Sequence, residues 1–383
     1  MANDKSFKIK NGILAQRYLQ TSGTETAGSE GYNLAGAAYD SKSFSVATQE
    51  TAPRSVNFKS DGTKMYVIGT GSDTVYQYTL STTWDVSTAS YDSVGFSVAT
   101  QDGAPFDIAF KPDGTKFYIA GNNSSAVYQY SLSTAWDMST ASYDSVSFSV
   151  STQGPNPHAV LFKDDGTAMY ALSSNNETIF QYTLGTAWDV STASYASKSY
   201  AFANTPDAGP ENVAFNDTGT KFYMVGTSGD AVYQYSVSTA WDISTVSYDS
   251  ISFSVAGQDT TPHDVFFGNS GTKMYIVGNL TDTIYQYSTV ALTQTLDLST
   301  GTYFSLTPSG ATTVLFTNPP ASGLAIGFSV EIIGDGSAIT WPASVKWHEA
   351  TAPTATATKE IYVFITTDGG TTYYGKKAAE GVA

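Results

Sequence analysis

Five positions of the sequence carry side chains that could bind or transform a ligand, and they recur at one place in a repeated pattern. Each follows a proline, and the types differ from copy to copy: Arg54, Phe106, His158, Glu211 and His263. Together they offer charge, hydrogen bonds and a surface for stacking. The two histidines stand in copies that are not neighbours, so we expect them to be apart unless a channel between the copies is narrow.

Catalysis by paired carboxylates is the enzymatic alternative. A glycan hydrolase or lyase would need two carboxylates that converge on one surface, and the candidates by position are Asp102, Asp207, Glu211 and Asp259. The sequence has no HxxEH, GxSxG or phosphate-loop pattern. It has no cysteine and three histidines, and its Asp-Gly-Thr turns are too sparse in acid for a calcium loop. We therefore expect a protein that is not an enzyme, without a metal or another cofactor.

These residues lie in five copies of a repeat of about 52 residues, marked by Tyr39, Tyr91, Tyr143, Tyr195 and Tyr248. A Gly-Thr turn, an aromatic-Gln-Tyr triplet and a Trp-Asp pair keep the same phase. In the first copy we expect strands at 55–58, 64–68, 74–80 and 93–98. The second and third strands are apolar on both faces, which is typical of sheets stacked radially as the blades of a β-propeller.

The ends of the repeat array predict that the propeller closes. The fifth copy stops at Tyr287 without its Trp-Asp connection and fourth strand, and an unpaired fourth strand stands at 39–48. If that strand completes the fifth blade, no sheet edge stays exposed. An open solenoid is the alternative, but it would need capping units.

Within each blade we expect the Gln of the triplet to bridge to a neighbouring blade, the Trp to pack on its own blade, and the Asp after the Trp to cap a turn.

The copies differ mainly on the face that carries the strand 2–3 and strand 4–1 loops, which we call the loop face. This pattern favours ligand recognition there, whereas the alternative is that the loops are merely unconstrained. Their polar side chains and few aromatic rings suit a glycan. The predicted ligand-binding residues are Arg54, Asp73, Asp102, Phe106, Asn122, Asn123, Asn156, His158, Asn175, Asn176, Glu211, Asp230, Asp259, His263 and Asp282.

Charge and hydropathy exclude several partners. The formal net charge is −16, from 34 acidic and 18 basic residues, and this field repels phosphate backbones, so we expect no nucleic acid. The sequence has no apolar run long enough to span a membrane, and it begins without a secretory signal, so we expect no membrane insertion.

Two segments outside the repeats complete the predicted organisation of an all-β chain. Residues 1–38 read as a docking segment followed by a Gly/Ser/Thr-rich linker at 21–36, with Phe7, Ile9, Ile13, Leu14 and Tyr18 as the docking side chains. Residues 39–290 form the five-bladed propeller. Residues 291–383 alternate strand-like runs with turn signals, which predicts a C-terminal β-sandwich.

The C-terminal segment resembles the β domain of tail-fibre and virion structural proteins of tailed bacteriophages. The matching residues are the runs 296–304, 339–347 and 367–375, with Ala352-Pro between them, and residues 7–13 match more weakly. The resemblance implies a virion protein assembled in the host cytoplasm. Its partners would be other virion proteins, further copies of itself, with a trimer favoured, and a host-surface glycan. The alternatives are a decoration protein, a bacterial adhesin and a glycan-acting enzyme.

Overall fold

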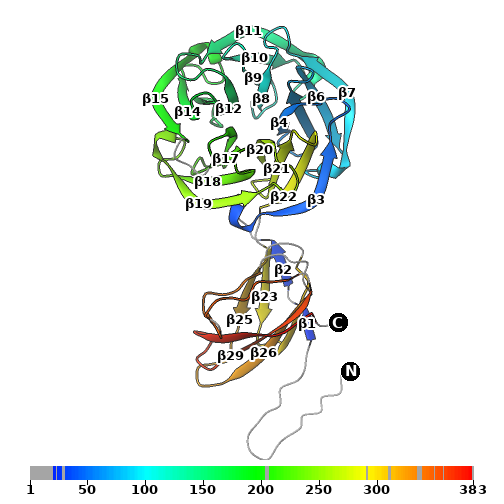
Figure 1. The fold of residues 1–383 in the computed structure, drawn as a ribbon, viewed down its shortest axis with the longest axis vertical. Helices are drawn as coiled ribbons and strands as arrows, with labels where there is room; N and C mark the ends of the chain where they lie inside the picture. Colours follow the sequence, from blue (N-terminus) through cyan, green and yellow to red (C-terminus); the bar gives the residue numbers. More distant parts are fainter. Residues whose placement is uncertain are drawn as a thin grey trace, which may run out of the picture. The chain divides into compact units, whose positions relative to one another are not determined.

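The computed structural model describes residues 20–22, 24–27, 31–202, 207–289, 292–308, 312–333, 339–348, 350–356 and 358–381. The chain divides into two compact units. One combines Met1–Ser29 with Ala291–Ala383, and the other is Glu30–Val290. The second unit is the predicted five-bladed β-propeller (Figure 1). No helix within the described ranges is long and apolar enough to cross a membrane.

Each blade is a four-stranded antiparallel sheet whose first strand lies nearest the central channel (Figure 1). Blade one consists of β4 (Pro53–Phe58), β5 (Lys64–Gly69), β6 (Thr74–Leu80) and β7 (Ala89–Ser97). The following three blades are β8 (Pro105–Phe110), β9 (Lys116–Gly121), β10 (Ala126–Leu132) and β11 (Ala141–Ser149); β12 (Pro157–Phe162), β13 (Ala168–Ser173), β14 (Thr178–Leu184) and β15 (Ala193–Ala201); and β16 (Pro210–Phe215), β17 (Lys221–Gly226), β18 (Ala231–Val237) and β19 (Val246–Ser254).

Blade five is closed by the N-terminal strand, as predicted. It consists of β20 (Pro262–Gly268), β21 (Lys273–Gly278), β22 (Thr283–Ser288) and β3 (Ala38–Ser45). Tyr287 pairs with Tyr39 in the antiparallel register that other blades use between their third and fourth strands. The N-terminal segment also supplies the connection that the fifth copy lacks, because Tyr32 and Asn33 stand where the other blades have Trp and Asp.

The apolar faces of the second strands pack between blades, as their sequence indicated. Met65 on β5 belongs to a cluster with Tyr275 of blade five, whereas its neighbour Tyr66 belongs to a cluster with Phe117 of blade two. All four side chains are fully buried. Burying a side chain of this size stabilises the fold by roughly 1.5–3 kcal/mol. Each second strand therefore contributes to two cores.

Polar contacts predicted from the triplet and the Trp-Asp pair are confirmed. Gln77 Oε1 accepts a hydrogen bond at 2.9 Å from the Met138 backbone N–H in the next blade. Gln129, Gln181 and Gln286 accept equivalent hydrogen bonds from backbone N–H groups of their neighbouring blades. Asp85 is the N-cap of the short helix η2 (Val86–Thr88), and its side chain accepts from Ser87 N–H. Equivalent caps precede η3 (Met138–Thr140), η4 (Val190–Thr192) and η5 (Ile243–Thr245), and Asn33 caps η1 (Leu34–Gly36).

The C-terminal unit contains two sheets around one core, which is the predicted β-sandwich. The strands are β1 (Gln20–Ser22), β2 (Thr24–Ala27), β23 (Leu292–Asp297), β24 (Tyr303–Leu306), β25 (Thr312–Thr317), β26 (Ile326–Ile333), β27 (Ile339–Thr340), β28 (Val345–Trp347), β29 (Lys359–Thr366) and β30 (Tyr373–Glu380). One sheet has the order β1-β24-β26-β29-β30-β28 and the other β2-β23-β25-β27. Leu296 and Val314 of the smaller sheet share a core with Phe328 and Tyr362 of the larger one.

The predicted linker at 21–36 has more structure than its composition indicated. β1 pairs with β24 and β2 pairs with β23, so both strands belong to the sandwich. Residues 31–36 belong to the propeller, where Tyr32 N–H donates to the Gly271 carbonyl. Backbone hydrogen bonds need no particular side chain, and this is why a Gly/Ser/Thr-rich segment can complete a sheet.

Replacing Gly114 by alanine should destabilise the propeller by about 2 kcal/mol or more. Gly114 has a φ of +71° in the turn between β8 and β9, and a Cβ there would lie 2.2 Å from Trp136 Nε1. Chemical denaturation of the variant measures the loss. Gly257→Ala is the control, because a Cβ at Gly257 meets nothing within 4 Å. If the two variants were equally stable, the packing of Trp136 against Gly114 would not be what excludes a side chain at position 114.

Candidate functional site

A β-bulge at the start of each innermost strand places one side chain at the loop-face mouth of the channel. The strand register shifts between the opening proline and the residue two positions later in all five blades. The residue between them is the extra one, and a bulge re-aims such a side chain. In chain order these bulge residues are Arg54, Phe106, His158, Glu211 and His263, which we call the mouth ring.

The mouth ring is a closed circle of contacts. The Arg54 guanidinium lies 4.4 Å from the centroid of the Phe106 ring, and Phe106 stacks on His158 with centroids 4.4 Å apart. Glu211 Oε2 lies 3.1 Å from His158 Nδ1 and 3.0 Å from His263 Nδ1. Arg54 Nη1 lies 3.0 Å from His263 Nε2. The channel is therefore narrow, and the two histidines that the sequence placed in separate blades meet on one carboxylate.

The two histidines contact Glu211 differently. His263 Nδ1 lies within hydrogen-bond distance of Glu211 Oε2, and Arg54 Nη1 lies 3.2 Å from Nδ1 and 3.0 Å from Nε2 of the same ring. His158 Nδ1 is within ion-pair distance of Glu211, although the angle is not that of a hydrogen bond. The Nδ1 edge of the His158 ring therefore faces the carboxylate.

Electrostatics keep the carboxylate charged. Burial of Glu211 opposes ionisation, but the neighbouring imidazoles of His158 and His263 outweigh it and lower the pKa of Glu211 to about 2. Burial also lowers the pKa of Arg54, against the opposing attraction of Glu211 and Glu50. Glu211 and His158 retain 16% and 13% side-chain exposure, so both remain partly accessible to solvent.

A second layer of side chains lies beneath the mouth ring, two residues after each proline. Four are polar, Ser55, Asp107, Asn212 and Asp264, and the fifth is Ala159. Asp107 accepts from Ser55 Oγ at 2.6 Å and from Val160 N–H of the next blade at 2.7 Å. Asp264 accepts from Val56 N–H at 2.7 Å. Burial raises the pKa of both carboxyls, and the charge of Asp107 raises that of Asp264 further.

Four other loop-face carboxylates hold the loops together. Asp102 accepts from Ala104 N–H, Ser124 N–H and Ser124 Oγ, which joins the strand 4–1 loop to the strand 2–3 loop. Asp207, Asp259 and Glu50 make the same kind of bridge in their blades. The predicted carboxylate candidates Asp102, Asp207 and Asp259 are thus bonded to backbone groups, and Glu211 alone belongs to the mouth ring.

The remaining predicted loop residues have local roles. Asp73, Asp230 and Asp282 have positive φ at the end of the strand 2–3 loops, and their carbonyls accept from Val98, Val255 and Val46.

Asparagines of blades two and three form a short hydrogen-bonded chain. Asn156 Nδ2 donates to Asn122 at 3.1 Å, and Asn175 Nδ2 donates to Asn156 at 3.0 Å. Asn176 bonds to the Gln153 carbonyl and Asn123 donates its backbone N–H to Asp102. The predicted docking residues Phe7, Ile9, Ile13, Leu14 and Tyr18 lie outside the described residues.

The fold defines a β-propeller with the mouth ring at one end of its channel, and one family model matches part of it. A family model described as a seven-bladed β-propeller lactonase matches residues 37–187, which is less than half of the chain. Those residues include Arg54, Phe106 and His158. A search of curated proteins finds no match.

Solved propeller structures resemble the chain at low identity. A protein of Lactobacillus plantarum is 20% identical with a TM-score of 0.36, and the match covers 51% of this chain and 53% of that one. The periplasmic gluconolactonase of Pseudomonas aeruginosa is 12% identical with a TM-score of 0.36, and the match covers 61% and 65%. A protein of Desulfotomaculum acetoxidans, described as functionally unknown, is 12% identical with a TM-score of 0.40, and the match covers 60% and 80%. These likenesses carry no argument about function.

Two expectations from the sequence are wrong in light of the family match. The sequence predicts a non-enzymatic virion protein that presents its propeller for attachment, but residues 37–187 match a lactonase family. The expectation rested on the flanking segments, whereas the family match lies in the propeller. The alternative of a glycan-acting enzyme fits this finding better.

Asp102→Ala should destabilise the propeller by about 2 kcal/mol, because it removes the acceptor shared by the N–H groups of Ala104, Asn123 and Ser124. Asp102 is 4% exposed. Asp165→Ala is the control, since Asp165 is an exposed turn carboxylate that bonds Thr167, and we expect it to cost about 1 kcal/mol or less. Urea denaturation measures both. If Asp102→Ala cost no more than the control, its carboxylate would be free for a ligand.

Proposed function

We propose that this chain is a hydrolase that opens a cyclic ester, with its active site on the mouth ring. The observation that carries the proposal is the closed set of contacts that gathers a cation, an ionised carboxylate and two imidazoles at one mouth of the channel. The match of residues 37–187 to a lactonase family supports a lactone as the substrate.

His158 is the proposed general base. Its Nδ1 faces Glu211, so its Nε2 is placed to take a proton from water as the water oxygen attacks the lactone carbonyl carbon. Glu211 is a positioning residue, because its charge favours the imidazolium that forms. When the ring C–O bond breaks, His158 returns the proton to the leaving alkoxide oxygen. The product is an open hydroxy acid.

Arg54 is the proposed binder of negative charge. The attack places a charge on the former carbonyl oxygen, and a fixed guanidinium stabilises that charge more than it stabilises the neutral ester. His263 and Phe106 hold Arg54 from two sides, through a hydrogen bond and a cation–π contact. Such support reduces the reorganisation that the charge would otherwise require.

The small number of blades limits where the substrate can bind. Five blades enclose a narrower channel than the seven of the matching family. The bulge side chains touch one another and close the channel, so the lactone must lie above the mouth ring, among the strand 2–3 loops. The asparagine chain of Asn122, Asn156 and Asn175 borders this space on the side of His158 and offers amide groups to substrate hydroxyls.

His158→Ala should lower kcat by roughly 10²–10⁴-fold, the usual contribution of a general base. The substrate panel is gluconolactone, its 6-phosphate and a simple aliphatic lactone, and the acid released is followed with a pH indicator after the uncatalysed rate is subtracted. Glu211→Gln should lower kcat by a smaller factor with KM little changed. Arg54→Met should lower kcat/KM, since it removes charge from the transition state.

His348→Ala is the matched control, because His348 is the third histidine and lies in the sandwich unit. It should retain the activity of the unaltered protein. The proposal is overturned if no lactone is hydrolysed above the uncatalysed rate. It is also overturned if His158→Ala, correctly folded by circular dichroism, keeps full activity.

A further inference from the structure

The loop face carries a band of carboxylates around the mouth ring that the proposed reaction does not use. Each blade contributes two loop positions to it, the last residue of the strand 2–3 loop and the third residue before the opening proline. Most of these positions are acidic, and we call the acidic ones the acidic rim: Glu50, Asp73, Asp102, Glu177, Asp207, Asp230, Asp259 and Asp282.

The carboxylates of the acidic rim act on one another and on the mouth ring. Burial raises the pKa of the Asp73 and Asp282 carboxyls, and the charge of Glu50 raises both further. Burial lowers the pKa of Arg54, and the charges of Glu211 and Glu50 oppose that shift. The field of the acidic rim therefore reaches a residue that we expect to bind the substrate.

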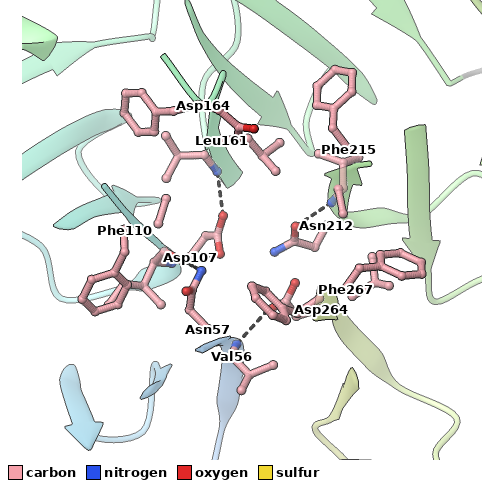
Figure 2. Close-up of a pocket in the computed structure, with 18 of the residues that line it drawn as sticks. Val56, Asn57, Asp107, Phe110, Leu161, Asp164, Asn212, Phe215, Asp264 and Phe267 are labelled. Carbon is pink, nitrogen blue, oxygen red and sulfur yellow. Dashed lines mark hydrogen bonds between the residues drawn. The ribbon is translucent and has the colours of Figure 1, made fainter. Parts of the chain in front are cut away.

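Cations that could balance the acidic rim lie elsewhere. Each lysine of the propeller unit is ion-paired with an aspartate of a strand 1–2 turn, a strand 3–4 connection or an outermost strand. In the described part of the loop face, Arg54 is the one lysine or arginine. Figure 2 shows Asp107 and Asn212 pointing toward the space beneath the mouth ring, and no lysine or arginine is among the described residues that line it.

The acidic rim has one gap, where blade two has Ser125 and blade three has Gly154. The two positions adjoin, because Asn156 N–H, two residues after Gly154, donates to Ser125 Oγ at 3.2 Å. In blade two the equivalent donor, Ala104 N–H, bonds to the rim carboxylate of Asp102, and blades one, four and five have the same bond. A neutral hydroxyl thus replaces a carboxylate at this one place.

The asparagine chain lies at the gap and has hydrogen-bonding capacity to spare. Asn122 accepts from Asn156 through its oxygen, which leaves its Nδ2 group as a donor. Asn175 donates through Nδ2, which leaves its oxygen as an acceptor. A sugar hydroxyl both donates and accepts, so uncharged amides of this kind suit it.

We propose that the acidic rim restricts the substrate to an uncharged polyhydroxy lactone, excludes the phosphate ester of that lactone, and leaves the gap as the place where the hydroxyls bind. This inference rests on the lactone hydrolysis proposed above and adds the charge class of the substrate. A phosphate monoester carries about two negative charges at neutral pH, and a field of the same sign lowers its concentration at the site. The same repulsion favours release of the product, because ring opening converts a neutral lactone into a carboxylate.

The test compares kcat/KM for gluconolactone and for its 6-phosphate at two salt concentrations. The Debye length falls from about 30 Å at 0.01 M salt to about 3 Å at 1 M, so NaCl screens the acidic rim. At the lower concentration we expect the phosphate to be hydrolysed roughly tenfold less efficiently or worse. The difference should shrink as NaCl is added, because the repulsion is electrostatic.

Neutralising two carboxylates of the acidic rim should relax this selection. Asp73→Asn combined with Asp282→Asn should raise the kcat/KM of the phosphate relative to that of gluconolactone roughly tenfold at low salt. Both residues have positive φ, which asparagine accepts, so the loop backbone is kept. Asp61→Asn combined with Asp113→Asn is the control, because it removes the same charge from the strand 1–2 turns, on the opposite face, and should leave the ratio unchanged.

Asn122→Ala tests the gap. It should raise KM for gluconolactone about fivefold, the usual effect of one lost hydrogen bond. Asn279 has the same loop position in blade five, where the rim positions are acidic, and its N–H makes the equivalent backbone bond. Asn279→Ala is therefore the matched control and should leave KM unchanged.

Binding separates a failure of this inference from a failure of the proposed function. Calorimetric titration with gluconolactam, whose ring resists opening, and with its 6-phosphate measures charge selection without hydrolysis. The inference is overturned if the phosphate is bound or hydrolysed as well as the uncharged ligand at low salt, or if the two asparagine variants have equal KM. If gluconolactam binds in preference to its phosphate but no lactone is opened, the proposed function fails and the charge selection stands. If neither lactam binds, both fail.

Discussion

Closure of five blades around one axis is the constraint on which the rest of the molecule depends. Because the second strand of each blade is apolar on both faces, every blade must be covered on two sides, and only a closed circle covers them all. Five blades bring the innermost strands so close that the side chains of the mouth ring contact one another. The narrow channel then separates two polar regions, one open to the loop face and one beneath it.

Much of the fold could be predicted because its signals are local and repeated. Each local signal depends on a few residues at fixed spacing: the Asp-Gly-Thr turn, the Asp cap after the Trp, and the Gln bridge. The signals recur from copy to copy, which strengthens the prediction. Closure could be predicted because the fifth copy lacks one strand and one unpaired strand precedes the first copy. The linker at 21–36 was less predictable, because strands such as β2 are held by backbone pairing that leaves little trace in composition.

The site was only partly predictable. The sequence singled out the five mouth-ring residues by their variation, but it could not show that His158 and His263 share Glu211, since that depends on the radius of the channel. It also grouped Asp102 and Asp259 with the ligand-binding residues, although both accept hydrogen bonds from loop backbone. A carboxylate aimed at a ligand and one aimed at an amide look alike in sequence. Asp107 and Asp264 were missed, because two residues of a β-strand separate them from the loops.

The pairing of β3 with β22 has a consequence for how the chain acquires its structure. The first strand of the propeller to leave the ribosome has no partner until the last copy has been made, so Tyr39 must stay available while four blades form. Such a contact joins residues at opposite ends of the propeller and carries a large loop-closure entropy. Blades one to four can form from consecutive residues, whereas blade five has to wait. Moving the chain ends to a loop between two complete blades would shorten this delay without altering any strand pairing.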